Sequence, residues 1–250
     1  MSAIYLKLFL LALVSVAFVL LAPVRKGAGQ SETYLGKLKI VARRSPQDFV
    51  PDGDLNKKIW KGAETVRIDQ NARDPERLPE FESRVAGLWT ERYVYFAFWN
   101  PYRILNIYEG ESPEKERWEL WQRDVVEVFI NPQPERFNHY YEFEVAPNNQ
   151  WIDLVIDLTK KPFNDAKWDS GFEHATRIDD KNRVWTCEMR IPVAVMEVRQ
   201  MKPDTEWRLN FYRADGPGAD SQRRFMTWSP LPKRGSFHQP ASFSIIRFVK

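Results

Sequence analysis

The feature that most constrains this chain is a succession of short segments in which apolar and polar residues alternate. A period of two is typical of strands with one buried face. These segments are rich in β-branched and aromatic residues and are bounded by Pro, Asn, Asp or Gly. The nine clearest span 38–42, 83–90, 93–100, 124–130, 140–146, 151–158, 184–191, 207–214 and 242–248.

Helical periodicity is weak by comparison. After residue 24 no stretch keeps a long 3.6-residue apolar period, and only 113–122 and 193–201 are predicted as short helices. Nine or more strands without crossover helices predict an all-β fold. We expect a two-sheet antiparallel β-sandwich of the jelly-roll or immunoglobulin-like kind.

The connections between these segments are of two kinds. Glu91-Arg92 and Asn148-Asn149 each separate two predicted strands and indicate hairpin turns. The loops over 69–82, 101–123, 131–139 and 215–240 are long, and binding sites on sandwiches usually lie on such loops. Trp118 and Trp121 lie near the end of one long loop, Trp228 and Phe237 near the end of another.

The N-terminus has a different character from the rest of the chain. Lys7 precedes an unbroken apolar run over 8–21, which is typical of a secretory signal peptide and short for a full membrane span. The sequence therefore predicts a signal peptide or membrane anchor over 1–24, a polar linker over 25–36 and a domain over 37–250. Either outcome places the domain outside the cytoplasm, with possible membrane attachment through the N-terminal segment.

The charge of the predicted domain argues against nucleic acid as a partner. The chain has 37 Lys and Arg against 34 Asp and Glu, and residues 1–30 hold three of the basic residues and no acid. The remainder is therefore balanced at 34 against 34, whereas binding to phosphates needs a surplus of Lys and Arg. Cys187 is the single cysteine. It alternates with apolar residues and is predicted to be a small buried residue on a strand.

Several motifs follow one another in an order that resembles the family-9 carbohydrate-binding modules, in the wider DOMON-like group. The resemblance covers 38–250. It rests on Asp52-Gly-Asp54 with Trp60, Val85–Tyr95, Trp121-x-x-Asp124-x-x-Glu127, Val184–Pro192, Trp228-Ser-Pro230 and Phe237–Phe243. Members of this family are two-sheet β-sandwiches that bind carbohydrate without catalysis.

The resemblance implies a site in which Trp121 and Trp228 clamp a terminal sugar of an oligo- or polysaccharide, with Asp124 and Glu127 on its hydroxyl groups. Flat aromatic faces bury the C–H faces of a pyranose, and polar side chains bind its rim. Trp118 shares the loop of Trp121 and is a further candidate. The alternatives are that both clamp residues are core, that Asp124 caps its loop, and that Glu127 is an ordinary exposed residue.

One position departs from the family pattern. Glu144 occupies a place where sugar-binding relatives can carry Arg, and Arg213 is a candidate for a compensating cation. Glu142 and Glu144 share a strand face, as do Asp153 and Asp157, so a glycoside hydrolase is a rival interpretation, although alternating acids on a solvated strand face are common.

A haem-binding electron-transfer domain is the other rival, because some DOMON-like domains bind haem. Met189, Met226 and His238 are the candidate axial ligands. A structural calcium at Asp52 and Asp54 is possible, with a simple turn as the alternative.

Overall fold

The computed structural model describes residues 32–250, with the exception of 75, 111–114 and 220–221. The predicted signal peptide or anchor over 1–24 lies outside the described residues. None of the helices within the described part of the chain is long and apolar enough to cross a membrane.

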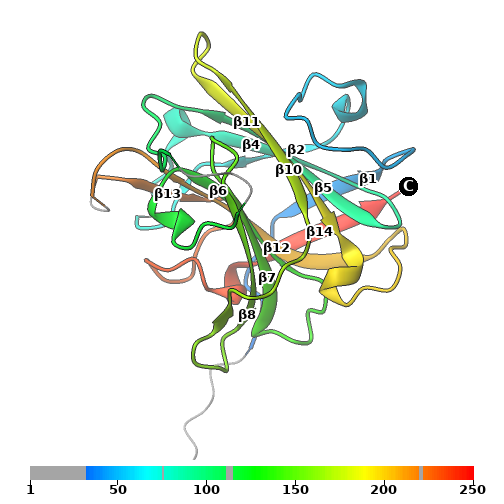
Figure 1. Ribbon diagram of the computed structural model, residues 1–250. Helices are drawn as coiled ribbons and strands as arrows, with labels where there is room; N and C mark the ends of the chain where they lie inside the picture. Colours follow the sequence, from blue (N-terminus) through cyan, green and yellow to red (C-terminus); the bar gives the residue numbers. More distant parts are fainter. Residues whose placement is uncertain (1–31, 75, 111–114, 220–221) are drawn as a thin grey trace, which may run out of the picture. The chain divides into compact units, whose positions relative to one another are not determined.

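The domain is almost entirely β-structure, as the alternation predicts (Figure 1). All nine predicted segments are strands, and five shorter or more polar ones were missed: β2, β3, β9, β10 and β13. The strands are β1 (Lys39–Arg44), β2 (Thr65–Ile68), β3 (Gln70–Asn71), β4 (Ser83–Trp89), β5 (Tyr93–Pro101), β6 (Val125–Asn131), β7 (His139–Val145), β8 (Trp151–Asp157), β9 (Asn164–Asp165), β10 (Glu173–Asp179), β11 (Val184–Pro192), β12 (Glu206–Asp215), β13 (Arg224–Thr227) and β14 (Ser244–Val249).

Helix is confined to single 3₁₀ turns in the described residues. These turns are η1 (Lys58–Trp60), η2 (Pro79–Phe81), η3 (Leu120–Gln122), η4 (Val193–Met196) and η5 (Pro240–Ser242). The third and fourth lie inside the two segments predicted as short helices. Each is shorter than expected, and neither begins with a side-chain cap.

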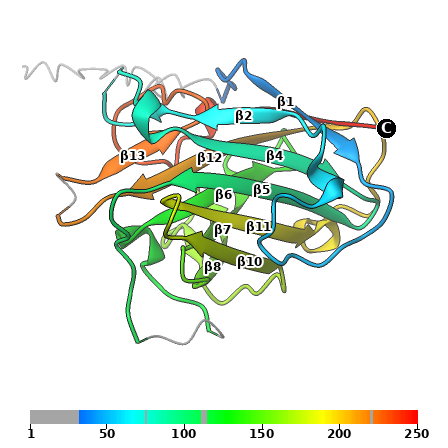
Figure 2. The same cartoon turned by 90° about the horizontal axis from the view of Figure 1, so that it is seen from above.

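The strands form one curled sheet whose two halves face each other across the core (Figures 1 and 2). Strands β10, β11, β5 and β4 form one layer, and β14, β12, β6, β7 and β8 form the other. Strand β1 joins the layers by pairing with both β4 and β14, and both pairings are parallel. The predicted two-sheet antiparallel β-sandwich is confirmed, and the two parallel pairings of β1 are the exception among the described strands.

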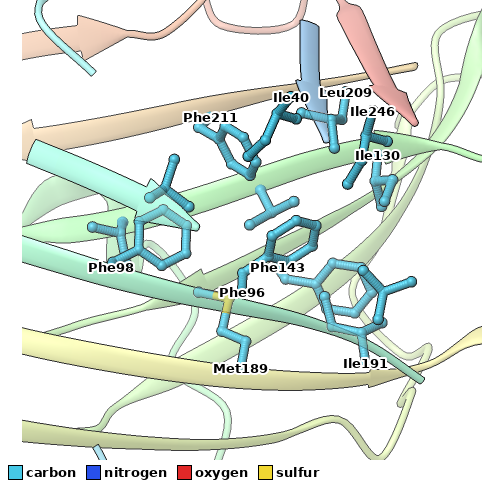
Figure 3. Packing of buried hydrophobic residues seen from close by; sticks show 14 of the residues in the cluster. Ile40, Phe96, Phe98, Ile130, Phe143, Met189, Ile191, Leu209, Phe211 and Ile246 are labelled. Carbon is cyan, nitrogen blue, oxygen red and sulfur yellow. The ribbon is translucent and has the colours of Figure 1, made fainter. Parts of the chain in front are cut away.

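The main hydrophobic core fills the space between the two layers (Figure 3). Phe96, Phe98 and Met189 from the first layer pack against side chains that include Phe143 and Phe211 from the second. The Phe96 and Phe211 rings meet edge to face, with their centroids 5.2 Å apart. Aromatic pairs in this geometry stabilise a core beyond the area that they bury. On the opposite face of β6, β7 and β12, alternating residues such as Phe129, Tyr140 and Tyr212 form a second buried cluster.

Cys187 and the two predicted hairpin turns lie where the sequence places them. Cys187 is fully buried in the main core, as predicted. Both hairpin turns are present, with Thr90 and Ala146 donating backbone hydrogen bonds to Tyr93 and Gln150 respectively. The end of the predicted linker is held against the domain, because the backbone of Leu35 donates to the Ala241 carbonyl at 2.7 Å.

Candidate functional site

A cavity of about 400 Å³ lies on the face of the second layer that points away from the main core. Strands β6, β7 and β8 supply its floor, and the short strands β9 and β13 together with loops supply its walls. Three of the four long loops predicted from the sequence contribute to it. Its lining comprises Arg73, Trp121, Glu127, Phe129, Glu142, Glu144, Leu154, Phe163, Asn164, Phe225, Gly235, Ser236, Phe237 and His238.

The floor is built by strand register. Glu127 on β6 pairs with Glu144 on β7, and Phe129 pairs with Glu142, so these four side chains share one face. The neighbours of Glu127 along its strand that point the other way, such as Val126 and Val128, belong to the main core. The predicted facing of Glu127 is confirmed. The expectation of an exposed side chain is wrong, because loops cover this face and leave Glu127 only 2% exposed.

The three carboxyl groups of the floor form a tight cluster. One oxygen from each of Glu127, Glu142 and Glu144 lies within 4.8 Å of the other two. Burial raises the pKa of Glu142 to about 8. Burial and neighbouring carboxylates raise the pKa values of Glu127 and Glu144 well above their usual range. Alternation alone favoured a solvated strand face for Glu142 and Glu144. That interpretation is wrong, because both side chains are buried.

Aromatic side chains form much of the wall. Trp121, Phe225 and Phe237 all line the cavity and are each half-buried. The rings of Phe225 and Phe237 approach to 6.1 Å between centroids, and Phe237 stacks on Tyr212 at 4.2 Å. Half-buried aromatic rings offer flat apolar surface to a ligand without being needed to fill the core.

The predicted candidate Trp118 lies beside Trp121 at the rim. Their ring centroids are 5.0 Å apart in an edge-to-face arrangement, and Trp118 is 47% exposed. Trp118 is not part of the cavity lining, but it extends the aromatic surface outward from Trp121. The structure therefore brings together Trp118, Trp121 and Glu127 from the predicted set.

His238 closes one end of the floor. Its ring stacks on Phe129, and its Nδ1 is 2.8 Å from the Tyr140 hydroxyl. Burial lowers the pKa of His238 to about 4, so the ring is neutral near pH 7. A neutral imidazole adds no positive charge beside the three carboxyl groups.

Trp228 is not part of this site, and the expectation of a clamp between Trp121 and Trp228 is wrong. Trp228 is 4% exposed and belongs to the main core, where its ring packs against Phe211 at 5.5 Å. Its backbone N–H donates to the Phe211 carbonyl. The residue directly follows β13, whose pairing with β12 turns the Trp228 side chain inward.

Arg213 also faces the wrong side of the sheet to act on the cavity. Its cross-strand neighbours Val126 and Met226 are core residues, and the guanidinium group is 1% exposed. It forms an ion pair with Asp215 at 2.8 Å and donates to the Ser83 hydroxyl at 2.8 Å. The expectation of a compensating cation near Glu144 is therefore wrong, because Arg213 neutralises a different buried acid.

Asp124 matches the alternative role of a loop cap. Its carboxylate accepts backbone hydrogen bonds from Asn106 at 3.0 Å and from Gly216 at 2.9 Å. It is 1% exposed, and burial raises its pKa to about 6. Asp124 thus ties together the two loops that carry Trp121 and Phe225, and it does not line the cavity.

The haem ligand candidates do not converge. Met189 and Met226 are fully buried in the main core, and His238 is the one candidate that lines the cavity. At the proposed calcium position, Asp52 forms an ion pair with Lys57 at 2.9 Å, and Asp54 lies 3.4 Å from Arg177. Asp52 and Asp54 also accept backbone hydrogen bonds in the manner of a turn.

A larger cavity of about 670 Å³ lies elsewhere on the domain. Arg44, Arg92 and Lys250 are among its lining residues, and no aromatic side chain is among those described there. It therefore offers no surface on which a ring could stack. The smaller cavity is the better candidate because it combines aromatic walls with a buried polar floor.

Sequence reasoning missed Phe225 and Arg73 as wall residues, and it noted Phe237 and His238 without assigning them to a sugar site. Phe225 lies on β13, a four-residue strand too short to show alternation. The Arg73 guanidinium lies 3.9 Å from the Phe225 ring centroid. A pattern of aromatic residues in the 215–240 loop was the available signal, but it did not distinguish the inward Trp228 from the cavity-lining Phe225.

The fold is shared with solved structures. A chain from Bacteroides uniformis ATCC 8492 superposes with a TM-score of 0.68 at 18% identity, over 85% of this chain and 99% of that one. A carbohydrate binding module of family 9 from Caldicellulosiruptor kristjanssonii, solved in complex with cellotriose, superposes with a TM-score of 0.62 at 16% identity, over 85% and 94%. At these identities the likeness establishes the fold.

Sequence comparison gives a more direct assignment. An "Extracellular protein" from the fungus Arthroderma benhamiae is 25% identical over 195 residues, which cover 74% of this chain and 78% of the relative. The model of the family described as "Carbohydrate family 9 binding domain-like" matches residues 51–250. That match includes every strand from β2 to β14 and the whole cavity lining. The chain belongs to the carbohydrate family 9 binding domain-like family.

Proposed function

We propose that this domain binds carbohydrate in the cavity floored by Glu127, Glu142 and Glu144. The observation that carries the proposal is the combination of half-buried aromatic walls with buried oxygen acceptors in one sugar-sized space. Aromatic faces remove the C–H surface of a pyranose from water, and carboxyl groups bind its hydroxyl groups. The cellotriose complex of the Caldicellulosiruptor module supports a glucan-type probe.

We propose binding without catalysis. Glycosidases place two carboxyl groups about 5–10 Å apart on either side of the scissile bond. In the floor, one oxygen from each of the three carboxyl groups lies within 4.8 Å of the other two, and all three side chains project from the same face of the sheet. The floor thus presents its carboxyl groups to one side of a bound sugar and not to both sides of a glycosidic bond, which suits recognition and not bond cleavage.

Calorimetric titration of the full chain with cellotriose tests the proposal. Trp121→Ala should weaken binding by about tenfold or more, which corresponds to about 1.4 kcal/mol or more. Trp99→Ala is the matched control, because Trp99 is 36% exposed on β5 and does not line the cavity. Equal loss in both variants, or no binding of any neutral or charged saccharide, would contradict the proposal.

We further propose that the domain acts outside the cytoplasm, delivered or held there by the segment over 1–24. The apolar run over 8–21 and the extracellular relative support this location. Fractionation of cells that express the full chain with a C-terminal tag tests it. The tag should be accessible to external protease, and a tag recovered only in the cytoplasmic fraction would contradict the proposal.

A further inference from the structure

The cavity floor has a property that a neutral sugar does not require. Glu127, Glu142 and Glu144 are 2%, 3% and 0% exposed. Glu142 and Glu144 are close enough to share one proton between them. Apart from that shared proton, three oxygens of the floor have no hydrogen-bond partner among the residues that the structure describes. They are both carboxyl oxygens of Glu144 and Oε2 of Glu142. Buried acceptors without partners are costly unless a ligand satisfies them.

The charge around the floor is also incomplete. With one proton shared by Glu142 and Glu144, the cluster carries two negative charges at most. Arg223 lowers the pKa of Glu127 through its charge and so offsets one of them. The neighbouring charges that act most strongly on Glu142 and Glu144 are other carboxylates. Arg73 also lines the cavity, with its guanidinium group 3.9 Å from the Phe225 ring centroid. Because burial raises the pKa of all three carboxyl groups, a cation that binds between them would favour their ionised forms, and the floor is complementary to such a cation.

The walls indicate what kind of molecule brings this cation. A bare ion would occupy the floor but would leave the faces of Trp121, Phe225 and Phe237 unused. A volume of about 400 Å³ is within the range of small organic ligand sites. An ammonium group has three N–H donors and no acceptor, which matches three converging carboxyl groups. Aromatic faces also attract an organic cation.

We propose that the cavity selects a saccharide with a free amine, of the 2-amino-2-deoxyhexose class, and that the ammonium group binds Glu127, Glu142 and Glu144. The inference rests on the proposed function and specifies its ligand. An N-acetylated sugar has the same ring but no charge, and it replaces three donors with one. The ratio of the affinities for the free amine and the N-acetylated sugar therefore measures how much the three carboxyl groups contribute to binding.

The experiment compares three trisaccharides on the full chain by calorimetry at about pH 6, where a sugar amine of the α-amino type is protonated. The probes are the β-1,4-linked trimers of glucosamine, N-acetylglucosamine and glucose. The glucosamine trimer should bind at least tenfold more tightly than the other two. Equal affinity for the glucosamine and glucose trimers would overturn the inference and leave sugar binding intact. Absence of binding by all three would contradict the proposed function itself.

Two variants locate the effect. Glu144→Gln keeps the shape of the side chain but removes its charge, and it should lower the affinity for the glucosamine trimer to that for the glucose trimer. Glu135→Gln changes an exposed residue outside the cavity and should leave both affinities unchanged. Retention of the amine preference in Glu144→Gln would contradict the assignment, because the preference would then arise elsewhere.

A further set of titrations tests whether the floor binds an ammonium group or a divalent cation, because both would use the same oxygens. All titrations are repeated with EDTA and with added Ca²⁺. We expect EDTA to leave the affinity for the glucosamine trimer unchanged. Added Ca²⁺ should either leave this affinity unchanged or lower it by competing with the ammonium group. If Ca²⁺ instead raises the affinity for the glucose trimer in the unmodified chain but not in Glu144→Gln, the floor is a metal site and the amine proposal is overturned.

Discussion

Glu127 on β6 and Glu144 on β7 are directly paired across two antiparallel strands, and both carboxyl groups are buried on the same face of the sheet. Directly opposed side chains in such a pair have Cβ atoms about 5 Å apart, and like charges there are destabilising. The rest of the fold therefore has to offset the unfavourable Glu127–Glu144 pair, which places hydrogen-bond acceptors at the bottom of the cavity. This arrangement makes the stability of the domain sensitive to the protonation of its floor.

The pKa of Glu142 gives this sensitivity a definite sign. Burial raises that pKa from 4.5 to about 8, so the folded chain holds a proton that the unfolded chain releases. The resulting stability is fully present below about pH 4 and is lost as the pH rises through about 8. Within this window the free energy of unfolding should fall by up to about 1.4 kcal/mol for each pH unit. Denaturant titrations between about pH 6.5 and 8 measure this slope.

Glu142→Gln isolates that contribution and should flatten the slope. His238 acts in the opposite direction, because its lowered pKa of about 4 makes stability rise with pH up to about 6.5. The range above pH 6.5 avoids this effect. The other groups around the floor, namely Glu127, Glu144, Arg73 and Arg223, are the same in both proteins. Identical slopes in the two proteins would show that Glu142 does not retain its proton in the folded state.

Trp228→Ala should destabilise the domain by about 3–5 kcal/mol, because a large ring in the main core leaves a cavity when it is removed. Thermal melts measure the loss. The folded fraction should keep its affinity for cellotriose, since Trp228 does not line the cavity. An unchanged melting temperature together with a large loss of affinity would instead support the hypothesis that Trp121 and Trp228 both contact the sugar.

Phe225→Ala should have the opposite profile. The ring is half-buried on β13 and lines the cavity, so its removal should weaken cellotriose binding by about 1–3 kcal/mol. The free energy of unfolding should change by less than the loss in Trp228→Ala. Calorimetry beside denaturant titration gives both quantities for one sample. Full retention of affinity would remove Phe225 from the proposed site.

Arg213→Met tests the structural role of a buried ion pair. The change leaves Asp215 with Arg224 as its remaining cation and removes the donor to Ser83, so it should cost about 3–5 kcal/mol of stability. The double variant Arg213→Met with Asp215→Asn should recover part of this loss. A fall in cellotriose affinity without a fall in stability would mean that Arg213 acts on the ligand after all.

The sequence was sufficient for much of the fold because strand alternation is a local property. The nine predicted segments each kept a period of two, and the structure pairs all of them. The missed strands are short, as β3 and β9 are, or exposed along much of their length, as β10 is, so burial imposes no alternation on them. The parallel pairing of β1 was not predictable, because no local pattern distinguishes which neighbours a strand will have.

The site was only partly predictable for the same reason. Trp121 and Trp228 both lie beside long loops, yet one lines a cavity and the other is core. The difference is set by the pairing of β13 with β12, which is a tertiary fact. Glu142 and Glu144 were seen as neighbours on one strand face, but their burial depends on loops that cover β6 and β7 from residues far along the chain.

The position of β1 has a consequence for how this chain is made. The Leu38 backbone N–H and the Ser244 hydroxyl are 3.0 Å apart, although 206 residues separate them in sequence. Strand β14 must therefore leave the ribosome before β1 can gain its second neighbour. Until then β1 does not join the two layers. At a synthesis rate of about 5–20 residues per second, the β1 strand waits for roughly 10–40 seconds with one edge unpaired. An unpaired edge of this kind is where a nascent chain needs shielding from other chains.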